Sequence, residues 1–374
     1  MKELILLFLK LGATAFGGPA AHIAMIEEEV VRRRSWITHD EFLDLLGATY
    51  LIPGPNSTEM AIHIGYRRAG WRGLLAAGVC FTLPAVFITM FLARFYTLYG
   101  SLPQLQPFVS GIHPAIIAIM VGAITRLGKP VLKSRFSSVL CVFVLLLSLA
   151  GIDEVLLLVL AGAFGLLWSL RGKLRQSTMA LVALIPLISV QVAGSPATTA
   201  VHASLAGIGL FFLKVGSVLY GSGYVLVAYL QGGLVDTRHW ITQTQLFDAI
   251  AVGQITPGPV LSTATFVGYL MLGVPGALVA TIGIFLPSFF FVFAINPLIP
   301  KMRKSPLAGG FLDGVSAASV SLMLAVAIKL ALAGLTGFGE WIIFLAAAIA
   351  VAVWKINAAW IVIASAILGW VILR

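Results

Sequence analysis

The chain carries the same sequence pattern twice. Phe8-Leu9-Lys10-Leu11-Gly12 returns 204 positions later as Phe212-Leu213-Lys214-Val215-Gly216. Two further pairs at this shift are Trp36-Ile37-Thr38 with Trp240-Ile241-Thr242, and Pro53-Gly54-Pro55 with Pro257-Gly258-Pro259. One residue is then lost, and the match continues 203 positions apart. Any fold for this chain must therefore be built from two copies of one unit.

Apolar runs long enough to cross about 30 Å of hydrocarbon recur from Leu4 to the end of the sequence. Hydrophobic residues make up 60% of the chain and charged residues 10%, with a mean hydropathy of +1.03, unlike the composition of soluble domains. A secreted protein would show one short apolar run and then a polar body, so we expect the first run to belong to the fold. The predicted fold class is an all-α polytopic membrane protein.

The remaining composition excludes several function classes. The formal charge is +10, but the basic residues lie in short clusters between apolar runs, as in cytoplasmic loops, and do not indicate nucleic-acid binding. Cys80 and Cys141 lack CxxC spacing and predict neither a disulfide nor a metal site. GxSxG, HExxH and P-loop motifs are absent from the sequence, so we expect no enzyme, no cofactor and an ion gradient as the energy source.

Each copy opens with four apolar stretches of about fourteen residues, too short to span a bilayer comfortably. In the first copy, Gly17-Gly18-Pro19 separates residues 4–16 from 20–31. Pro53-Gly54-Pro55 separates residues 41–52 from 57–66. Because proline removes a backbone donor and glycine permits tight turns, we predict two re-entrant helical hairpins per copy. The alternative is four tilted, kinked spans or interfacial helices.

Longer spans follow in each copy. The first copy has them at 71–96, 107–127, 137–150 and 154–170, and the second at 274–295, 306–330, 338–353 and 358–373. An apolar segment at 179–192 has no counterpart and is the expected linker helix. The predicted units are a first repeat at 1–175, a linker transmembrane helix with its loop at 176–203, and a second repeat at 204–374.

The basic residues predict that the two repeats are inverted. In the first copy they flank the long helical hairpin, while its connecting loop at 99–107 is uncharged: Arg67, Arg68, Arg72, Arg126, Lys129, Lys133 and Arg135. In the second copy they lie in the connecting loop instead: Lys301, Arg303 and Lys304. Arg171, Lys173 and Arg175 are then also cytoplasmic. Inverted repeats around a site at the membrane midplane are typical of secondary transporters.

The breaks predict an anion site. Helix N-termini offer free N–H groups and a partial positive charge, and the breaks would bring such ends near the membrane middle. The candidate ligands are the glycines of the breaks and the polar residues that follow them: Gly17, Gly18, Gly54, Asn56, Ser57, Thr58, Gly258, Ser262 and Thr263. The alternative is that Asn56, Ser57 and Thr58 only cap a helix.

Three charged or titratable residues complete the candidate anion site. Lys10 and Lys214 are repeat-related cations on apolar helices and could face the anion, or they could snorkel or pair with Asp44 and Asp248. His22 follows the first break and is a further candidate ligand.

Two residues are candidates for proton coupling. Glu59 and His63 lie four positions apart and share a helix face. An acid buried in lipid is often held neutral and can take up a proton near physiological pH. The alternative is that each is a hydrogen-bonded structural residue.

These motifs resemble the chromate ion transporter family, in its long-chain type with two fused homologous domains. The resemblance rests on Phe16-Gly17-Gly18-Pro19, Ala21-His22-Ile23, Trp36, Phe42, Pro53-Gly54-Pro55-Asn56-Ser57-Thr58-Glu59, Ile64-Gly65, Gly253-Gln254 and Pro257-Gly258-Pro259. It implies proton-driven antiport that exports chromate across the bacterial inner membrane and gives chromate resistance, with sulfate as a mimic. The second copy departs from the family pattern at Tyr220-Gly221-Ser222-Gly223.

Two other functions stay open at this point. A membrane-embedded enzyme acting on lipid phosphates would also suit re-entrant hairpins with polar tips, and an anion channel would conduct without concentrating its substrate. The sequence also leaves open a homodimer, and whether the cargo is chromate, sulfate or another oxyanion.

Overall fold

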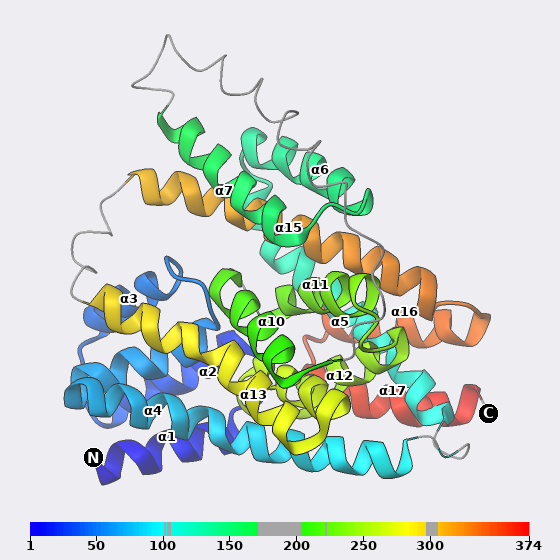
Figure 1. Cartoon of the computed structure of the whole chain (residues 1–374), viewed down its shortest axis with the longest axis horizontal. Coiled ribbons are helices and arrows are strands. Elements are labelled where there is room, and N and C mark those ends of the chain that lie inside the picture. The colour runs from blue at the N-terminus through cyan, green and yellow to red at the C-terminus, as the bar shows by residue number, and fades with distance from the viewer. Residues whose placement is uncertain (101, 103–105, 171–202, 221–222, 297–305, 374) are drawn as a thin grey trace.

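The computed structural model describes residues 1–100, 102, 106–170, 203–220, 223–296 and 306–373, and within these ranges the chain is helical, with no β-strand (Figure 1). Several sequence predictions lie outside the described residues: the linker helix at 179–192 and the basic residues Arg171, Lys173, Arg175, Lys301, Arg303 and Lys304, together with Gly221 and Ser222.

The first copy begins with two pairs of helices, each pair divided by a break. Helix α1 (Lys2–Thr14) ends just before the Gly17-Gly18 turn, and α2 (Pro19–Glu27) begins at a proline, which suits the first turn of a helix. A π-helical segment, η1 (Glu28–Arg33), extends α2. Helices α3 (His39–Thr49) and α4 (Asn56–Tyr99) lie on either side of Pro53-Gly54-Pro55. Both predicted helix breaks are confirmed.

Helix α4 is in fact two helices joined by a sharp reversal. The backbone is not helical at Ala69 and Gly70, and Gly65 then faces Gly73 so closely that a side chain at either would overlap the other's carbonyl. In a straight helix these residues would be about 12 Å apart along the axis. The second copy repeats the reversal in α13 (Thr263–Ile295), at Leu272 and Gly273. A short helix therefore precedes a long one in each copy, as the sequence predicted.

The second copy follows the same order with a less regular start. Its elements are α10 (Leu205–Val218), η3 (Gly223–Val225), α11 (Leu226–Leu230), η4 (Gln231–Thr237), α12 (Gln243–Ile255), η5 (Val260–Ser262), α13, α15 (Pro306–Gly334), α16 (Phe338–Ala352) and α17 (Ala358–Ile372). The first copy ends with α5 (Gln106–Val131), α6 (Arg135–Leu149) and α7 (Glu154–Leu170). Where the first copy has the continuous α2, the second has two short pieces, η3 and α11, and it has no proline equivalent to Pro19.

The C-terminal helices of each copy pack against the other copy. Helices α6 and α7 lie along α15, and α16 and α17 lie along α5 (Figure 1). Glycines allow close backbone contact at both crossings: Gly165 meets Gly310, and Gly111 meets Gly369. One continuous cluster of buried apolar residues includes side chains of both copies. The two repeats are therefore interlocked by reciprocal contacts.

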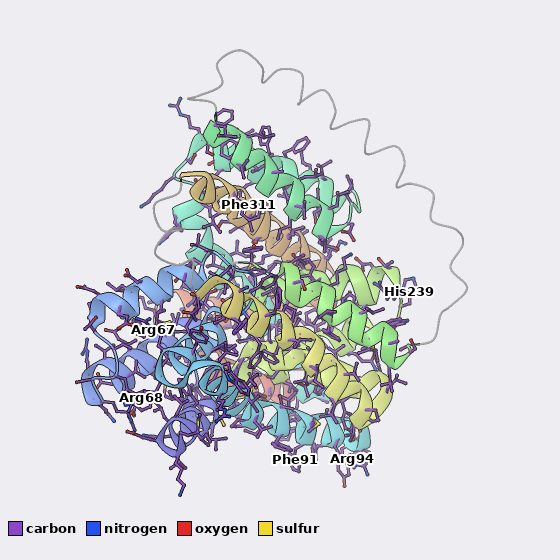
Figure 2. The ribbon with its side chains drawn as sticks, turned by 60° about the vertical axis from the view of Figure 1, so that its left-hand side comes forward. Arg67, Arg68, Phe91, Arg94, His239 and Phe311 are labelled. Atoms are coloured by element: carbon purple, nitrogen blue, oxygen red, sulfur yellow. The ribbon has the colours of Figure 1, made fainter. Side chains whose placement is uncertain are left out.

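The outer surface is suited to lipid. Among the described residues, four segments are long and apolar enough to cross a membrane: α4, α5, Val260–Ile295 and Gly309–Gly334. Large apolar side chains are exposed at repeat-related positions, with Leu6 and Leu210 both 67% exposed. Phe91 projects from the outer side of α4 (Figure 2). The chain is a multi-pass membrane protein with a lipid-facing apolar exterior.

Candidate functional site

The breaks of one copy are hydrogen-bonded to the other copy. The Gly258 N–H donates to the Ala15 carbonyl at the end of α1 at 2.8 Å, and the Gly54 N–H donates to the Leu219 carbonyl at the end of α10 at 2.7 Å. Ala15 and Leu219 are themselves repeat-related. Each Pro-Gly-Pro tip is thus fixed against the first helix of the opposite repeat.

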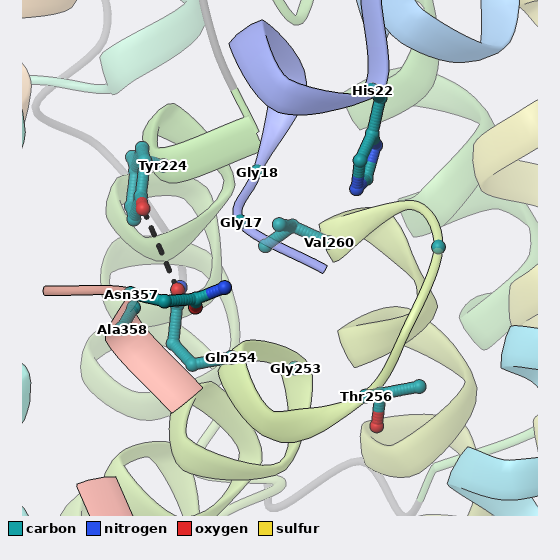
Figure 3. A pocket seen from close by; sticks show the side chains of 11 residues that line it. Gly17, Gly18, His22, Tyr224, Gly253, Gln254, Thr256, Val260, Asn357 and Ala358 are labelled. Carbon is teal, nitrogen blue, oxygen red and sulfur yellow. Dashed lines mark hydrogen bonds between the residues drawn. The ribbon is translucent and has the colours of Figure 1, made fainter. Parts of the chain in front are cut away.

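A small pocket lies where the first break of the first copy meets the second break of the second copy (Figure 3). It contains four of the predicted site residues, together with residues that the sequence did not indicate. Its lining is Gly17, Gly18, His22, Tyr224, Gly253, Gln254, Thr256, Gly258, Val260, Asn357 and Ala358.

Two helices begin at this pocket. Helix α2 starts after Gly18, which has a φ of 79° and has no side chain that could cap the first N–H groups of the helix. Helix α17 starts after Asn357, whose side chain accepts a hydrogen bond from the Ala359 N–H at 3.0 Å. The side-chain amide nitrogen of Asn357 remains available as a donor. Both helix ends present partial positive charge to the same space.

His22 is held rigidly beside the pocket. Its ring is 1% exposed, with Nε2 at 3.1 Å from the Ala15 carbonyl and Nδ1 at 3.4 Å from Ser57 Oγ. Because a carbonyl oxygen can only accept, Nε2 carries a proton, and in the neutral ring Nδ1 then accepts from the Ser57 hydroxyl. His22 therefore links α2 to the ends of α1 and α4.

Tyr224 and Gln254 supply polar groups from the second copy. The Tyr224 hydroxyl donates to Gln254 Oε1 at 3.4 Å, so the amide nitrogen of Gln254 keeps its two donors (Figure 3). Gln254 belongs to the Gly253-Gln254 motif, so the sequence did carry a signal that could have indicated it as a site residue. Asn357 had only the weak signal of a capping residue type before an apolar run.

A second polar cluster surrounds the Pro53-Gly54-Pro55 tip. The side chains of Glu59 and Ser288 both reach Gly54, where a Cβ atom would overlap Glu59 Oε1 and Ser288 Oγ. Neither carboxylate oxygen of Glu59 has a hydrogen-bond partner in the described part of the chain, nor does Ser288 Oγ or Thr58 Oγ1. All three side chains are fully buried. Such orphaned groups are uncommon and expensive in protein interiors.

The other predicted residues near the breaks have simpler surroundings. His63 is buried, and its Nδ1 lies 3.1 Å from the side-chain nitrogen of Asn296. Asn56 is half-buried at the first position of α4, whose N-cap residue is Pro55. The Thr263 hydroxyl donates to the Val260 carbonyl at 2.8 Å, and Ser262 Oγ is buried without a partner among the described residues.

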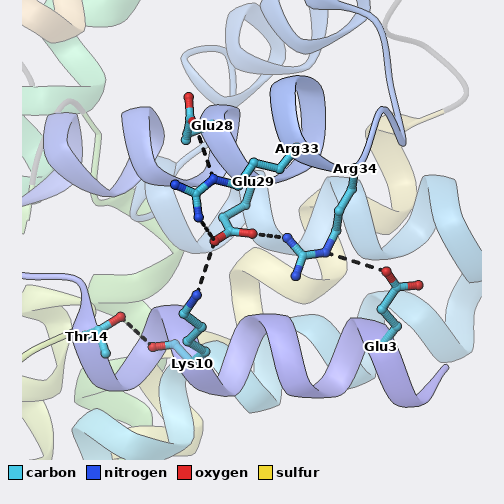
Figure 4. Close-up of polar contacts among 7 residues, drawn as sticks. All are labelled: Glu3, Lys10, Thr14, Glu28, Glu29, Arg33 and Arg34. Carbon is cyan, nitrogen blue, oxygen red and sulfur yellow. Dashed lines mark hydrogen bonds and ion pairs between the residues drawn. The ribbon is translucent and has the colours of Figure 1, made fainter.

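The two lysines lie on the surface, apart from the pocket lining. Lys10 Nζ is 3.3 Å from Glu29 Oε1, within a network in which Arg33 and Arg34 also contact Glu29 (Figure 4). Lys214 Nζ is 3.6 Å from Asp153 Oδ2. The acidic partner expected for Lys214, Asp248, instead contacts Tyr96 and His113. The lysine side chains are 59% and 52% exposed, because they reach outward from an apolar helix to polar partners.

Comparison with known proteins identifies relatives over most of the chain. The sequence model of the family described as Chromate transporter matches residues 2–166 and again 206–370. The chain is 35% identical to the chromate transport protein of Cupriavidus metallidurans, covering 88% of this chain and 82% of that protein.

Two further relatives are similar over almost their whole length. The probable chromate transport protein of Synechococcus elongatus is 32% identical over 96% of this chain and 91% of its own. The chromate transport protein of Pseudomonas aeruginosa is 31% identical over 99% of this chain and 92% of its own. No solved structure matches the chain.

Proposed function

Because this chain belongs to the chromate transporter family, we propose that it exports chromate across the bacterial cytoplasmic membrane, driven by the proton-motive force, and so gives chromate resistance. Three relatives named for chromate transport support the cargo. The interlocked repeats support a transporter in which one unit moves against the other.

The observation that carries the proposal is the pocket between the two breaks. Two helices, α2 and α17, begin there, and the amides of Asn357 and Gln254 add donors. A tetrahedral dianion needs several convergent N–H donors and little else, and helix N-termini provide them. At Gly18 no atom lies within 4 Å of where a Cβ would stand, so an anion can approach the backbone there.

The other predicted residues take supporting roles in this proposal. Ser57 acts through His22, which it contacts at 3.4 Å. Gly258 fixes the pocket wall through its hydrogen bond to Ala15. Lys10 and Lys214 have no direct contact with the anion, since each pairs with an acidic side chain.

Glu59 is the proposed proton carrier. Burying an ionised carboxylate without a partner costs several kcal/mol, so a carboxyl group in this position is suited to binding a proton. His63 lies one helical turn further along the same face and is the proposed second member of the proton path.

The proposal is tested by uptake of labelled chromate into inverted membrane vesicles with and without a proton gradient. Asn357→Asp keeps the α17 cap, because aspartate caps as well as asparagine, but adds a negative charge at the pocket. Like charges a few ångströms apart repel by about 1–4 kcal/mol, so the KM for chromate should rise at least about tenfold.

Two controls isolate the charge. Asn357→Ser retains a capping hydroxyl without charge and should transport far better than Asn357→Asp. Ser204→Asp makes a similar change at the exposed cap of α10 and should leave transport unchanged. An unaltered KM in Asn357→Asp would move the anion site elsewhere. Gradient-driven uptake of sulfate but not of chromate would show that the cargo is sulfate, while the proposed anion site would stand.

A further inference from the structure

A buried acidic residue, Asp248, lies outside the site described above. It is on α12, 5% exposed, and joins that helix to both long helices of the first copy. The Tyr96 hydroxyl on α4 donates to Asp248 Oδ2 at 2.6 Å, and His113 Nε2 on α5 lies 3.4 Å from Oδ1. A distance of 2.6 Å is at the short end of the range for O–H···O hydrogen bonds.

Aromatic contacts fix both partners of Asp248. The ring of His113 stacks on Phe247 at a centroid distance of 4.4 Å and an interplanar angle of 18°. The ring of Tyr96 meets Phe266 edge-on at 5.4 Å. The His113 side chain is 15% exposed.

Tyr96 and His113 are the titratable groups that contact Asp248 from the packed helices. No lysine or arginine of the described residues lies within 4.0 Å of its carboxylate. Other titratable groups on the elements packed around α12 have their own partners: Tyr224 with Gln254, Tyr229 with the Val218 carbonyl, and Asp236 with Lys329 and Gln231.

The repeat relationship shows that the fold itself does not require this cluster. The position equivalent to His113, 203 residues later, is Ser316, which does not titrate. The position equivalent to Asp248 is Asp44, which is only half-buried on α3. A buried acid–imidazole pair that joins the two repeats of a membrane protein at one place, without a repeat-related copy, is by default a functional feature.

We propose that Asp248 and His113, together with Tyr96, form a second proton-binding site that holds α12 against α4 and α5. With the imidazole protonated, the pair is electrically neutral and the contact is strong. When His113 releases its proton, a carboxylate charge remains buried between two neutral donors, and the contact weakens. Rising pH therefore favours separation of α12.

The site is connected to the pocket through a single helix. Helix α12 carries Asp248 and, six residues later, Gln254, which lines the pocket. A proton at Asp248 and His113 would therefore bias the position of a pocket residue. This site is separate from Glu59, and its failure would leave the proposed cargo and pocket intact.

The proposal is tested on the purified full chain in detergent by thermal unfolding at about pH 6 and about pH 8, the range in which histidine changes charge. The melting temperature of the wild type should fall as pH rises. In His113→Gln, which keeps a donor but cannot titrate, this fall should be absent. Asp248→Asn should abolish it as well. Asp44→Asn, the repeat-related control, should melt with the wild-type pH dependence.

Transport provides the second readout. In vesicles, the ratio of chromate transport rates at about pH 6 and about pH 8 should change at least about threefold in His113→Gln, since the titrating group has been removed. A wild-type ratio together with wild-type pH dependence of melting in His113→Gln would overturn the proposal. An equal loss of pH dependence in Asp44→Asn would also overturn it, by showing a general effect of acid removal.

Discussion

Unpartnered polar atoms gather near the Pro-Gly-Pro tips in the described part of the chain. Thr58, Glu59 and Ser262 follow the tips directly, and Ser288 reaches Gly54 from α13. A protein interior normally satisfies such groups, so their concentration in one region points to an occupant with its own donors and acceptors. Water supplies both donors and acceptors, an oxyanion supplies acceptors for the hydroxyl groups, and a proton bound to Glu59 would turn one of its oxygens into a donor.

Replacing the buried acid should uncouple transport from the proton gradient. Glu59→Gln keeps the side-chain shape but cannot bind or release a proton. We expect it to lose the roughly tenfold accumulation that one proton sustains across one pH unit, while chromate exchange without a gradient continues. Labelled-chromate uptake with imposed pH gradients measures both. Asp40→Asn, on the exposed first turn of α3, is the matched control and should accumulate chromate like the wild type. Wild-type accumulation in Glu59→Gln would show that Glu59 is not the proton carrier.

Sequence position predicted the surroundings of some residues and not of others. His22 and Glu59 follow a break, and local geometry alone brings both near a tip. Lys10 was a candidate because it lies in an apolar helix, yet its direction depends on Glu29, which η1 brings alongside α1. Partners fixed by tertiary packing cannot be read from local sequence: Asn357 has the residue type of a helix cap, but nothing in the sequence places it beside Gly17.

At the scale of elements, the tips are fixed by close backbone contacts. Gly258 has a φ of 89°, and a Cβ atom there would lie 3.0 Å from the Gly12 carbonyl oxygen and 3.1 Å from Ala85 Cβ. Gly273, at the reversal of α13, has a φ of 61° with nothing within 4 Å. The two positions share a left-handed backbone and differ in available space.

Gly258→Ala should therefore destabilise the protein more than Gly273→Ala. A positive φ costs an alanine about 1–3 kcal/mol at either position, and overpacking adds about 1–3 kcal/mol only at Gly258. Thermal unfolding in detergent should give a lower melting temperature for Gly258→Ala. Equal melting temperatures would show that the second-copy tip is loosely packed and does not form a fixed wall.

Helix positions were largely predictable because prolines and glycines divide long apolar runs. The predicted spans at 154–170 and 338–353 differ from α7 and α16 by at most one residue at either end. The start of the second copy was not predictable in this way. There, apolar composition continues through η3, α11 and η4, and the change of helix type depends on packing against α12 and α15.

The whole molecule depends on contacts between the copies. Helices α6 and α7 pack on α15, and α16 and α17 pack on α5, so neither repeat can bury its long helix alone. The apolar pattern within one copy cannot show that its last helices pack against the other copy. The sequence therefore predicted two repeats, but not that each repeat packs its C-terminal helices on the other.

Two chains divided in the segment between the copies should assemble only together. We expect residues 1–170 and 203–374, co-expressed, to restore chromate transport, and each alone to be degraded or to aggregate, because its apolar helix faces stay uncovered. Vesicle transport and co-purification through a tag on one half measure this. A half that is stable and monodisperse by itself would show that the helix contacts between the two copies are not required for folding.

The reciprocal packing has a further consequence for how such a protein can change over generations. If two identical chains paired in this way, every substitution would enter both equivalent positions at once. In one fused gene, each position changes alone within a shared framework: Glu59 stands opposite Thr263, Ser288 opposite Ala85 and Asn357 opposite Asp153. Fusion of the duplicated gene thus allowed each half to change independently at equivalent positions.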